Sequence, residues 1–250
     1  MKIILICVFY PPLKVSAAIQ ILDLAKELKF QGHEVTVITP DSTLKRNITI
    51  QNDYNIKTIR VKSGRLRDIG LFRRAVNEFL MPFQMIYRLF TISHFLKNND
   101  LLVWWSPSIF FTPLVIYLKI LNRCKTYLIL RDIFPQWAID LGIIKSRIIA
   151  FIFKSFYYVQ FLASDLVGIQ SVGDELYVPK KIFKKKIKLE ILNNWYTPSS
   201  SNEDCKFDLC STFLKSRKIF VYAGNIGLAQ DVELFINCLL YTSDAADDTT

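Results

Sequence analysis

Two glycines near the carboxyl-terminal end of the sequence have the spacing of a phosphate-binding turn. Gly224 and Gly227 follow an apolar run at residues 218–222, predicted to be a strand, and precede a predicted helix start. Glycine admits positive φ, so backbone N–H groups there can face an anion, and the helix would present its positive end to the same anion. The helix dipole contributes only about 0.3–1 kcal/mol, so several N–H hydrogen bonds must add to it. The segment therefore predicts either half of a phosphate site or an ordinary strand-to-helix turn.

The chain before this turn alternates apolar strands with helical patterns. Residues 2–10 form a nearly continuous apolar run, typical of a strand buried on both faces, and a helix at residues 16–31 follows from apolar residues at the 3.6 period. This alternation predicts an α/β fold with a Rossmann-like parallel sheet, in which ligands bind beyond the carboxyl ends of the strands. Further strands are predicted at residues 34–39, 57–61 (as an edge strand), 101–105, 126–130, 165–170 and 188–192, turns at 41–55, and helices at 77–96, 106–121, 146–162 and from Ser171.

Changes in composition divide the chain into parts. Residues 1–197 are predicted to form one complete domain, and residues 198–216, whose first part is rich in Pro, Ser, Asn, Asp and Glu, are predicted to be a linker. Residues 217–237 are then the first β-α unit of a second Rossmann-like domain. In residues 238–250 the helical pattern ends at Tyr241 and the string resembles a translated sequencing adapter, so this tail is predicted to be non-native.

The charge balance points to an anionic partner. The 250 residues carry a formal net charge of +10, which suits nucleic acid, an anionic membrane face or a phosphorylated substrate. The sequence has no zinc-finger spacing, no RNA-recognition aromatic motif and no basic region leading into heptads, so we expect no nucleic-acid partner. The 5 cysteines lack the paired spacing of a metal site or a disulfide framework, which indicates a reducing cytoplasm and no metal site.

A basic and aromatic segment could bind a membrane. Residues 60–74 hold five arginines and one lysine and precede the aromatic helix predicted at 77–96. Basic residues beside an apolar helix face each contribute about 1 kcal/mol of attraction to anionic lipid. The alternative is a core-facing helix beside a solvated basic loop. No window reaches the roughly 18–20 apolar residues that a membrane-spanning helix needs.

Four short segments occur in an order that indicates a family. They are Tyr10-Pro11-Pro12 with the later Gly32-His33 and its strand, Asp132-Ile133-Phe134-Pro135, Asn193-Asn194-Trp195, and Tyr222-Ala223-Gly224-Asn225-Ile226-Gly227. In this combination, residues 1 to about 237 resemble the amino-terminal portion of a GT-B glycosyltransferase of family 4, among members similar to fucosamine transferases of bacterial surface polysaccharide synthesis.

The resemblance implies two facing Rossmann-like domains and retaining sugar transfer from a nucleoside diphosphate sugar of the UDP or GDP type, with no metal or other cofactor. Asp132 would orient an acceptor hydroxyl, the alternatives being a helix N-cap or a pair with Arg131. N–H groups near Gly224 would stabilise the leaving diphosphate. The other implied residues are Val15, Ser16, Pro135, Gln136 and Trp137 for the acceptor, Asn193, Asn194 and Trp195 in the cleft, and Gly224, Asn225, Ile226, Gly227 and Gln230 for the donor.

Departures from the family pattern fall at three of these places. Val15-Ser16 stands where many relatives have Gly-Gly, Gln136 where they often have Glu, and Asn193 where they usually have Pro. The carboxylate motif that grips the donor is expected in a part of the second domain beyond Thr250.

The sequence thus predicts a peripheral enzyme on the cytoplasmic face of the membrane. It would transfer sugar to a lipid-diphosphate-linked or saccharide acceptor, with the 250-residue chain inactive alone. The alternative is a non-catalytic membrane-binding or assembly module, in which the glycine turn is only architecture. A dinucleotide enzyme is disfavoured because no G-x-G-x-x-G follows the first strand.

Overall fold

The chain folds into two compact units, Met1–Thr197 and Pro198–Thr250, and each is described by itself. The computed structural model describes residues 1–106, 108–182, 185–197, 211–215, 218–224, 226–227 and 230–247.

A single mostly parallel sheet organises the first unit. In the described part of the chain it has eight strands in the order β10-β7-β6-β5-β1-β2-β4-β3, and every pair is parallel except β3 with β4. This confirms the predicted α/β, Rossmann-like fold class. The strands are β1 (Lys2–Ile6), β2 (Glu34–Asp41), β3 (Ile48–Asp53), β4 (Ile56–Lys62), β5 (Leu101–Ser106), β6 (Lys125–Leu130), β7 (Leu166–Ile169) and β10 (Leu189–Ile191), with β8 (Lys181–Ile182) and β9 (Lys185–Lys186) paired separately.

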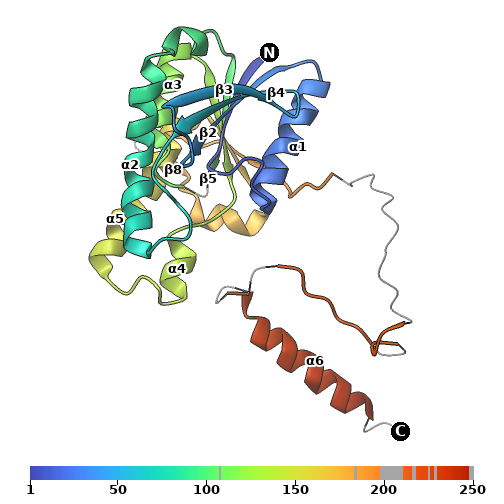
Figure 1. Ribbon diagram of the computed structural model, residues 1–250. Helices are drawn as coiled ribbons and strands as arrows, with labels where there is room; N and C mark the ends of the chain where they lie inside the picture. The colour runs from blue at the N-terminus through green and yellow to red at the C-terminus, as the bar shows by residue number, and fades with distance from the viewer. Residues whose placement is uncertain are drawn as a thin grey trace. The chain divides into compact units, whose positions relative to one another are not determined.

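Helices cover the two faces of the sheet unequally (Figure 1). α1 (Ser16–Phe30) lies on one face, whereas α2 (Leu71–Phe90), α3 (Thr112–Asn122) and α5 (Arg147–Ala163) lie on the other. Three shorter helices complete the described part of the unit, namely α4 (Gln136–Asp140) and the 3₁₀ helices η1 (Ser93–Leu96) and η2 (Val172–Tyr177).

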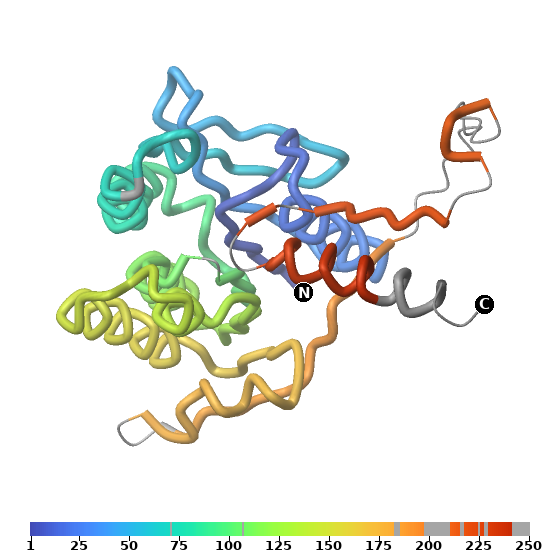
Figure 2. Tube along the Cα trace, turned by 90° about the horizontal axis from the view of Figure 1, so that it is seen from below, coloured from blue at the N-terminus to red at the C-terminus, as the bar shows by residue number. Residues whose placement is uncertain are grey.

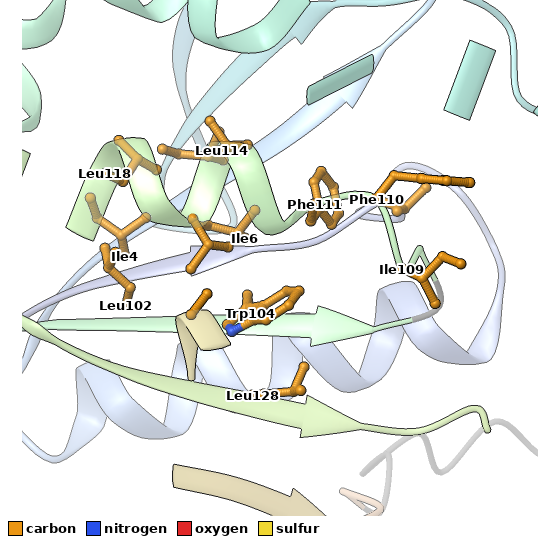
Figure 3. Close-up of a cluster of buried hydrophobic side chains, with 14 of the residues drawn as sticks. Ile4, Ile6, Leu102, Trp104, Ile109, Phe110, Phe111, Leu114, Leu118 and Leu128 are labelled. Carbon is orange, nitrogen blue, oxygen red and sulfur yellow. The ribbon is translucent and has the colours of Figure 1, made fainter. Parts of the chain in front are cut away.

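The core has two parts because successive strand residues point to opposite faces. Toward α3, the strand residues Ile4, Ile6 and Trp104 pack against Leu114 and Leu118 of the helix (Figure 3). Toward α1, the alternate strand residues Ile3, Leu5, Val103 and Trp105 pack with Ile21, Leu22 and Ala25. The continuous apolar run that predicted β1 therefore supplies both parts.

Three predicted strand positions were wrong. β1 ends at Ile6, so the apolar residues up to Tyr10 belong to the loop after it. The predicted edge strand at residues 57–61 is β4, which lies inside the sheet between β2 and β3. The true edge strand, β3, lies in the segment predicted as turns, and a tight turn with positive φ at Tyr54 and Asn55 joins it to β4.

Helix boundaries also differ from the predictions. The helix predicted from Ser106 was wrong, because β5 continues to Ser106 and α3 begins only at Thr112, beside Pro113. The aromatic helix begins earlier than predicted, at Leu71, and ends at Phe90. The helix predicted from Ser171 is the 3₁₀ helix η2, whose amino-terminal end is capped by a capping box between Ser171 and Asp174.

The second unit departs furthest from the predictions. Residues 218–224 form no strand, and among the described residues of this unit no strand is present to pair with them, so the strand predicted at 218–222 was wrong. α6 (Val232–Asp247) begins beyond the glycine turn and continues past Tyr241, so the predicted end of the helical pattern was wrong as well. Ala245 and Ala246 favour helix and explain the extension.

A half-buried network of polar side chains connects α3 to the amino ends of β6 and β7. Lys119 Nζ lies 2.8 Å from Asp165 Oδ2, which also accepts a 2.9 Å hydrogen bond from the Thr126 backbone N–H. Burial by itself would raise the pKa of Asp165, but the hydrogen bonds from Lys119 and Thr126 outweigh it and hold that pKa below its usual value. The ionised carboxylate therefore stabilises the folded chain.

We expect Asp165→Asn to lower the free energy of unfolding at pH 7 by about 1–2 kcal/mol, because it removes charge-assisted hydrogen bonds. A depressed folded-state pKa contributes stability above the unfolded value near about 3.9, and this contribution is lost as the pH falls through the folded-state pKa. Urea titrations of the two proteins should therefore converge below about pH 4. Glu34→Gln, which breaks the exposed pair with Lys2, is the control and should change stability by less than about 0.5 kcal/mol. An equal gap between Asp165→Asn and the parent chain at pH 3 and pH 7 would contradict this role.

Candidate functional site

The ends of the parallel strands create a common edge where the predicted site residues gather. In register, Ser106 pairs with Leu130, Leu130 with Ile169, and Ile169 with Ile191, so the loops after β5, β6, β7 and β10 start side by side. α1, α2, α3 and α5 all begin at this carboxyl edge, which Figure 2 shows end-on. In parallel sheets this is the edge where ligands bind.

One joint at this edge fastens the start of α1 to residues 193–195. Gln20 Nε2 donates hydrogen bonds to Asn194 Oδ1 (3.0 Å) and to the Trp195 carbonyl (3.2 Å), and Trp195 Nε1 donates to the Gln20 carbonyl (3.1 Å). Gln20 lies one turn after Val15 and Ser16. The structure thus brings together two of the segments predicted separately, as the adjacent tubes in Figure 2 show.

A stack of side chains continues from this joint to β6. The rings of Trp195 and Trp105 meet edge to face at a centroid distance of 5.7 Å, and the Arg131 guanidinium lies 5.0 Å from the Trp105 ring centroid. Gln170 Nε2 donates a 2.8 Å hydrogen bond to the Arg131 carbonyl. Neither Gln20 nor Trp105 was predicted as a site residue, because their roles arise only from these tertiary contacts.

Asp132 follows Arg131 directly and is exposed to solvent on one side. Protein atoms on its other sides desolvate the carboxylate and raise its pKa above the usual value, although nearby Arg131 opposes the shift. The N-cap alternative was wrong, because Pro135 occupies that position of α4. In the described ranges of the chain, no ion pair joins Asp132 to Arg131 either.

The segment after Asp132 offers fewer free groups than predicted. Pro135 is buried, and Gln136 Nε2 donates a 2.8 Å hydrogen bond to Asp140 Oδ1 within α4. Trp137 is exposed and packs on Phe134 at a centroid distance of 5.9 Å. Trp137 and Asp132 are therefore the accessible members of this predicted acceptor segment.

The predicted donor residues belong to the second unit. Neither Gly224 nor Gly227 adopts the positive φ that glycine admits, and Asn225 lies outside the described residues. Gln230 N–H donates to the Gly227 carbonyl at 3.1 Å. Asp231 caps the amino-terminal end of α6, because its carboxylate accepts a 3.4 Å hydrogen bond from the Leu234 N–H. Ile226 is exposed.

A pocket that sequence reasoning missed lies at the ends of β1, β2 and β4. Its volume is about 530 Å³, and Arg60 lies at its floor, held by Asp53 (2.7 Å), Asp41 (3.6 Å) and the Pro11 carbonyl. Arg60 was predicted in the basic surface segment but is buried, because β4 lies inside the sheet. The rest of the lining comes from residues 8–13, 39–43 and 63–68, with Arg65 and Arg67 among them.

An exposed apolar surface lies on the helices beside this edge. We call it the apolar rim: Phe72, Val76 and Phe79 of α2, Trp137 of α4, and Ile148, Phe151 and Ile152 of α5. Figure 1 shows the three helices that carry these residues. Phe79 packs against Phe156 of α5 at a centroid distance of 5.8 Å, which joins the two helices. The opposite face of α2 is core, with Met81, Met85 and Leu89 fully buried. The core-facing interpretation of this helix is therefore confirmed for its buried face, whereas membrane binding by its exposed face stays a prediction.

Basic side chains accompany the apolar rim. Arg65 and Arg67 lie in the loop before α2, Arg73 lies in the first turn of α2, and Arg147 and Lys154 lie in the first half of α5. In the portion of the chain covered by the structure, none of these five residues forms an ion pair. Among the described residues, no helix has both the length and the hydropathy needed to cross a membrane.

The side chains that could bind a metal ion or act as a thiol nucleophile are as follows in the described residues. No group of three or more His, Cys, Asp or Glu side chains among them is placed to hold a metal ion. Burial raises the pKa of the Cys7 thiol to about 12, which makes it a poor nucleophile. Cys205 and Cys210, the closest pair in the sequence, lie outside the described residues.

Comparison with solved structures finds the same fold in distantly related proteins. A sucrose-phosphate synthase from Thermosynechococcus elongatus matches 78% of this chain and 90% of its own at 13% identity, with a TM-score of 0.52. An E. coli structure described as trehalose-6-phosphate bound with UDP-2-fluoro glucose matches 76% of this chain at 11% identity and a TM-score of 0.51. A trehalose-phosphate synthase from Burkholderia xenovorans, in complex with glucose-6-phosphate, matches 71% at 12% identity and a TM-score of 0.50.

The last two matches span only 48% and 42% of those chains. No protein-family model and no curated protein sequence matches this chain. At 11–13% identity the structural likeness shows the fold alone. That fold is an α/β, Rossmann-like architecture, which this chain shares with the three structures.

We expect Gln20→Ala to release residues 193–197 from α1, because the variant loses both side-chain hydrogen bonds to Asn194 and Trp195. Amide hydrogen exchange in 193–197 should accelerate about 10-fold, the effect of losing about 1.4 kcal/mol of local stability. Gln31→Ala is the matched control, since Gln31 bonds only its helical neighbour Glu27 on the exposed end of α1. Unchanged exchange in Gln20→Ala would show that other contacts hold this segment.

Proposed function

We propose that the chain is the acceptor-binding part of a retaining glycosyltransferase that uses a nucleoside diphosphate sugar. The observation that supports this most is the unbroken series of contacts at the carboxyl edge. It runs from the start of α1 through Gln20, Trp195 and Trp105 to Arg131, and so to Asp132. Residues that the family resemblance assigned to one site thus share one edge of one sheet.

Asp132 is suited to receive a proton or a hydrogen bond from an acceptor hydroxyl. A carboxylate with a raised pKa is a stronger base than one in water. Its open side faces solvent, so an acceptor can reach it. The proposed role is to orient the hydroxyl that attacks the donor sugar.

The pocket at the ends of β1, β2 and β4 suits the sugar part of an acceptor. Tyr10 and Phe9 provide rings, while Ser42, Thr43 and Ser63 provide polar groups along the wall. Two strands, β5 and β1, lie between β6 and β2 in the sheet order. At a spacing of about 4.8 Å between neighbouring strands, the pocket therefore lies about 10–15 Å from Asp132. An acceptor of more than one sugar unit would span this distance.

We propose that the acceptor is carried by a lipid diphosphate and that the apolar rim rests on an anionic membrane. The rim exposes large apolar side chains next to unpaired arginines, the composition that favours interfacial binding. The enzyme would then be a peripheral protein on the cytoplasmic face, serving surface polysaccharide synthesis.

A second candidate function rests on the apolar rim alone. It is a non-catalytic module that binds a membrane or assembles other proteins there. In that case residues 224–227 take no part in nucleotide binding.

A chain extended to complete the second unit should transfer sugar from a UDP or GDP sugar, whereas the 250-residue chain alone should not. In the extended protein, Asp132→Asn should lower kcat at least about 100-fold and leave nucleotide affinity unchanged, because the variant loses the group that accepts the hydroxyl proton. Initial rates with radiolabelled donor and calorimetric titration with UDP and GDP measure the two quantities.

Glu34→Gln, at the opposite edge of the sheet, is the control for that variant. Gly224→Val with Gly227→Val should abolish nucleotide binding by the extended protein, whereas the module hypothesis expects no change. A complete protein that binds no nucleoside diphosphate sugar and transfers none would refute the proposed function.

The 250-residue chain should bind vesicles that contain phosphatidylglycerol and detach as salt is raised. Phe72 and Phe151 are 82% and 72% exposed, so either Phe→Ser change should weaken binding about five- to tenfold, as expected for a side chain half inserted into lipid. Phe30 of α1, 88% exposed near the amino edge, provides the matched control Phe30→Ser. Vesicle flotation measures all three variants, and equal loss in all three would contradict a role for the apolar rim.

A further inference from the structure

The guanidinium of Arg131 is partly buried. Its Nη1 atom is buried and has no hydrogen-bond partner among the described residues. Within the residues that the structure describes, no carboxylate forms an ion pair with it, even though Asp132 is its neighbour in sequence. Burial accordingly lowers the pKa of Arg131, with Asp132 opposing the shift. A buried donor without an acceptor destabilises the folded chain, so this arrangement does not serve stability well.

Contacts on two sides nevertheless hold the Arg131 side chain in place. Its guanidinium lies over the Trp105 ring, and Trp105 is itself fixed by the edge of Trp195. Gln170 anchors the Arg131 carbonyl. Stacking on an aromatic face leaves the N–H groups at the rim of the guanidinium plane free, and these match two oxygens of one anion. The fork is therefore ordered before any ligand arrives.

The position of Arg131 relates this unused cation to the proposed site. It follows the last residue of β6 and directly precedes Asp132, at the edge where parallel sheets bind ligands. The stabilisation by the cation–π contact is comparable to the destabilisation by the unpaired donor. In a purely structural role, the stabilisation by the contact with Trp105 and the destabilisation by the unpaired donor would nearly cancel. A bound anion would instead satisfy the buried N–H.

We propose that Arg131 binds a phosphoryl group through a bidentate pair of hydrogen bonds, next to the hydroxyl that Asp132 orients. The identity of that group rests on the proposed function, in which the donor and the acceptor both carry a diphosphate. The anion-binding role of Arg131 itself does not depend on sugar transfer.

Inorganic pyrophosphate is the first probe, titrated into the full 250-residue chain. Quenching of tryptophan fluorescence should report binding, since Trp105 touches the guanidinium, and calorimetry gives the affinity. Arg131→Gln should weaken binding at least about 10-fold. Arg131→Lys should weaken it less, because lysine keeps the charge but loses the planar fork.

Lys125→Gln is the matched control, because Lys125 is an exposed cation at the opposite end of the same strand. It should leave the pyrophosphate affinity unchanged. Thermal melts establish that each variant is folded, and Arg131→Lys keeps the test decisive if Arg131→Gln does not fold. Equal pyrophosphate binding by the parent chain and the folded Arg131 variants, no binding by the parent chain, or equally tight binding of malonate would overturn the proposal.

Two further ligands identify the source of the phosphoryl group. If Arg131→Gln weakens UDP or GDP binding, the group belongs to the donor, and if it weakens geranyl diphosphate binding, the group belongs to the lipid-linked acceptor. Either loss supports the proposal. In the extended protein, transfer that is insensitive to Arg131→Gln would overturn this inference alone, whereas lost pyrophosphate binding without any transfer activity would overturn the proposed function alone.

Discussion

The parallel pairing of β1, β5, β6 and β7 is the constraint on which the rest of the first unit depends. These strands are buried on both faces, so each must supply apolar side chains to both layers of the core. Their common direction also forces every following loop to one edge. The candidate site is therefore a consequence of the sheet: no loop had to be long to bring Arg131, Gln170 and Leu192 together.

Burial on both faces is also the reason why the sequence predicted the central strands well. A run such as residues 101–105 is apolar throughout and fits few structures other than a central strand. β3 was missed because its alternating polar residues suit an exposed edge and resemble a loop. Residues 218–222 show the opposite error, since local apolar pattern predicts a strand but only neighbouring strands make one. Ser106 belongs to β5 and not to the following helix because it pairs with Leu130 of β6, a contact that the sequence does not reveal.

The candidate site was predictable only where a residue follows a strand in the sequence. Asp132 and residues 193–195 met that condition, and the structure places both at the carboxyl edge. Gln20 shows no such signal, because a glutamine on an amphipathic helix normally faces solvent. Arg60 was assigned to a surface although it is buried, since its partners Asp41 and Asp53 lie on other strands. The burial of Arg60 and the contacts of Gln20 are set by pairing between segments that are distant in the sequence, so the local order of residues does not reveal them.

The reciprocal hydrogen bonds between Gln20 and Trp195 give the first unit a mechanical property. The chain leaves this unit at Thr197, two residues after Trp195, so a force on the departing chain acts on the clamp before it acts on the sheet. Trp195 would transmit that load to Trp105 and, through it, to the guanidinium of Arg131. The same four side chains that assemble the edge would therefore also couple a displacement of the departing chain to Arg131, the residue beside Asp132.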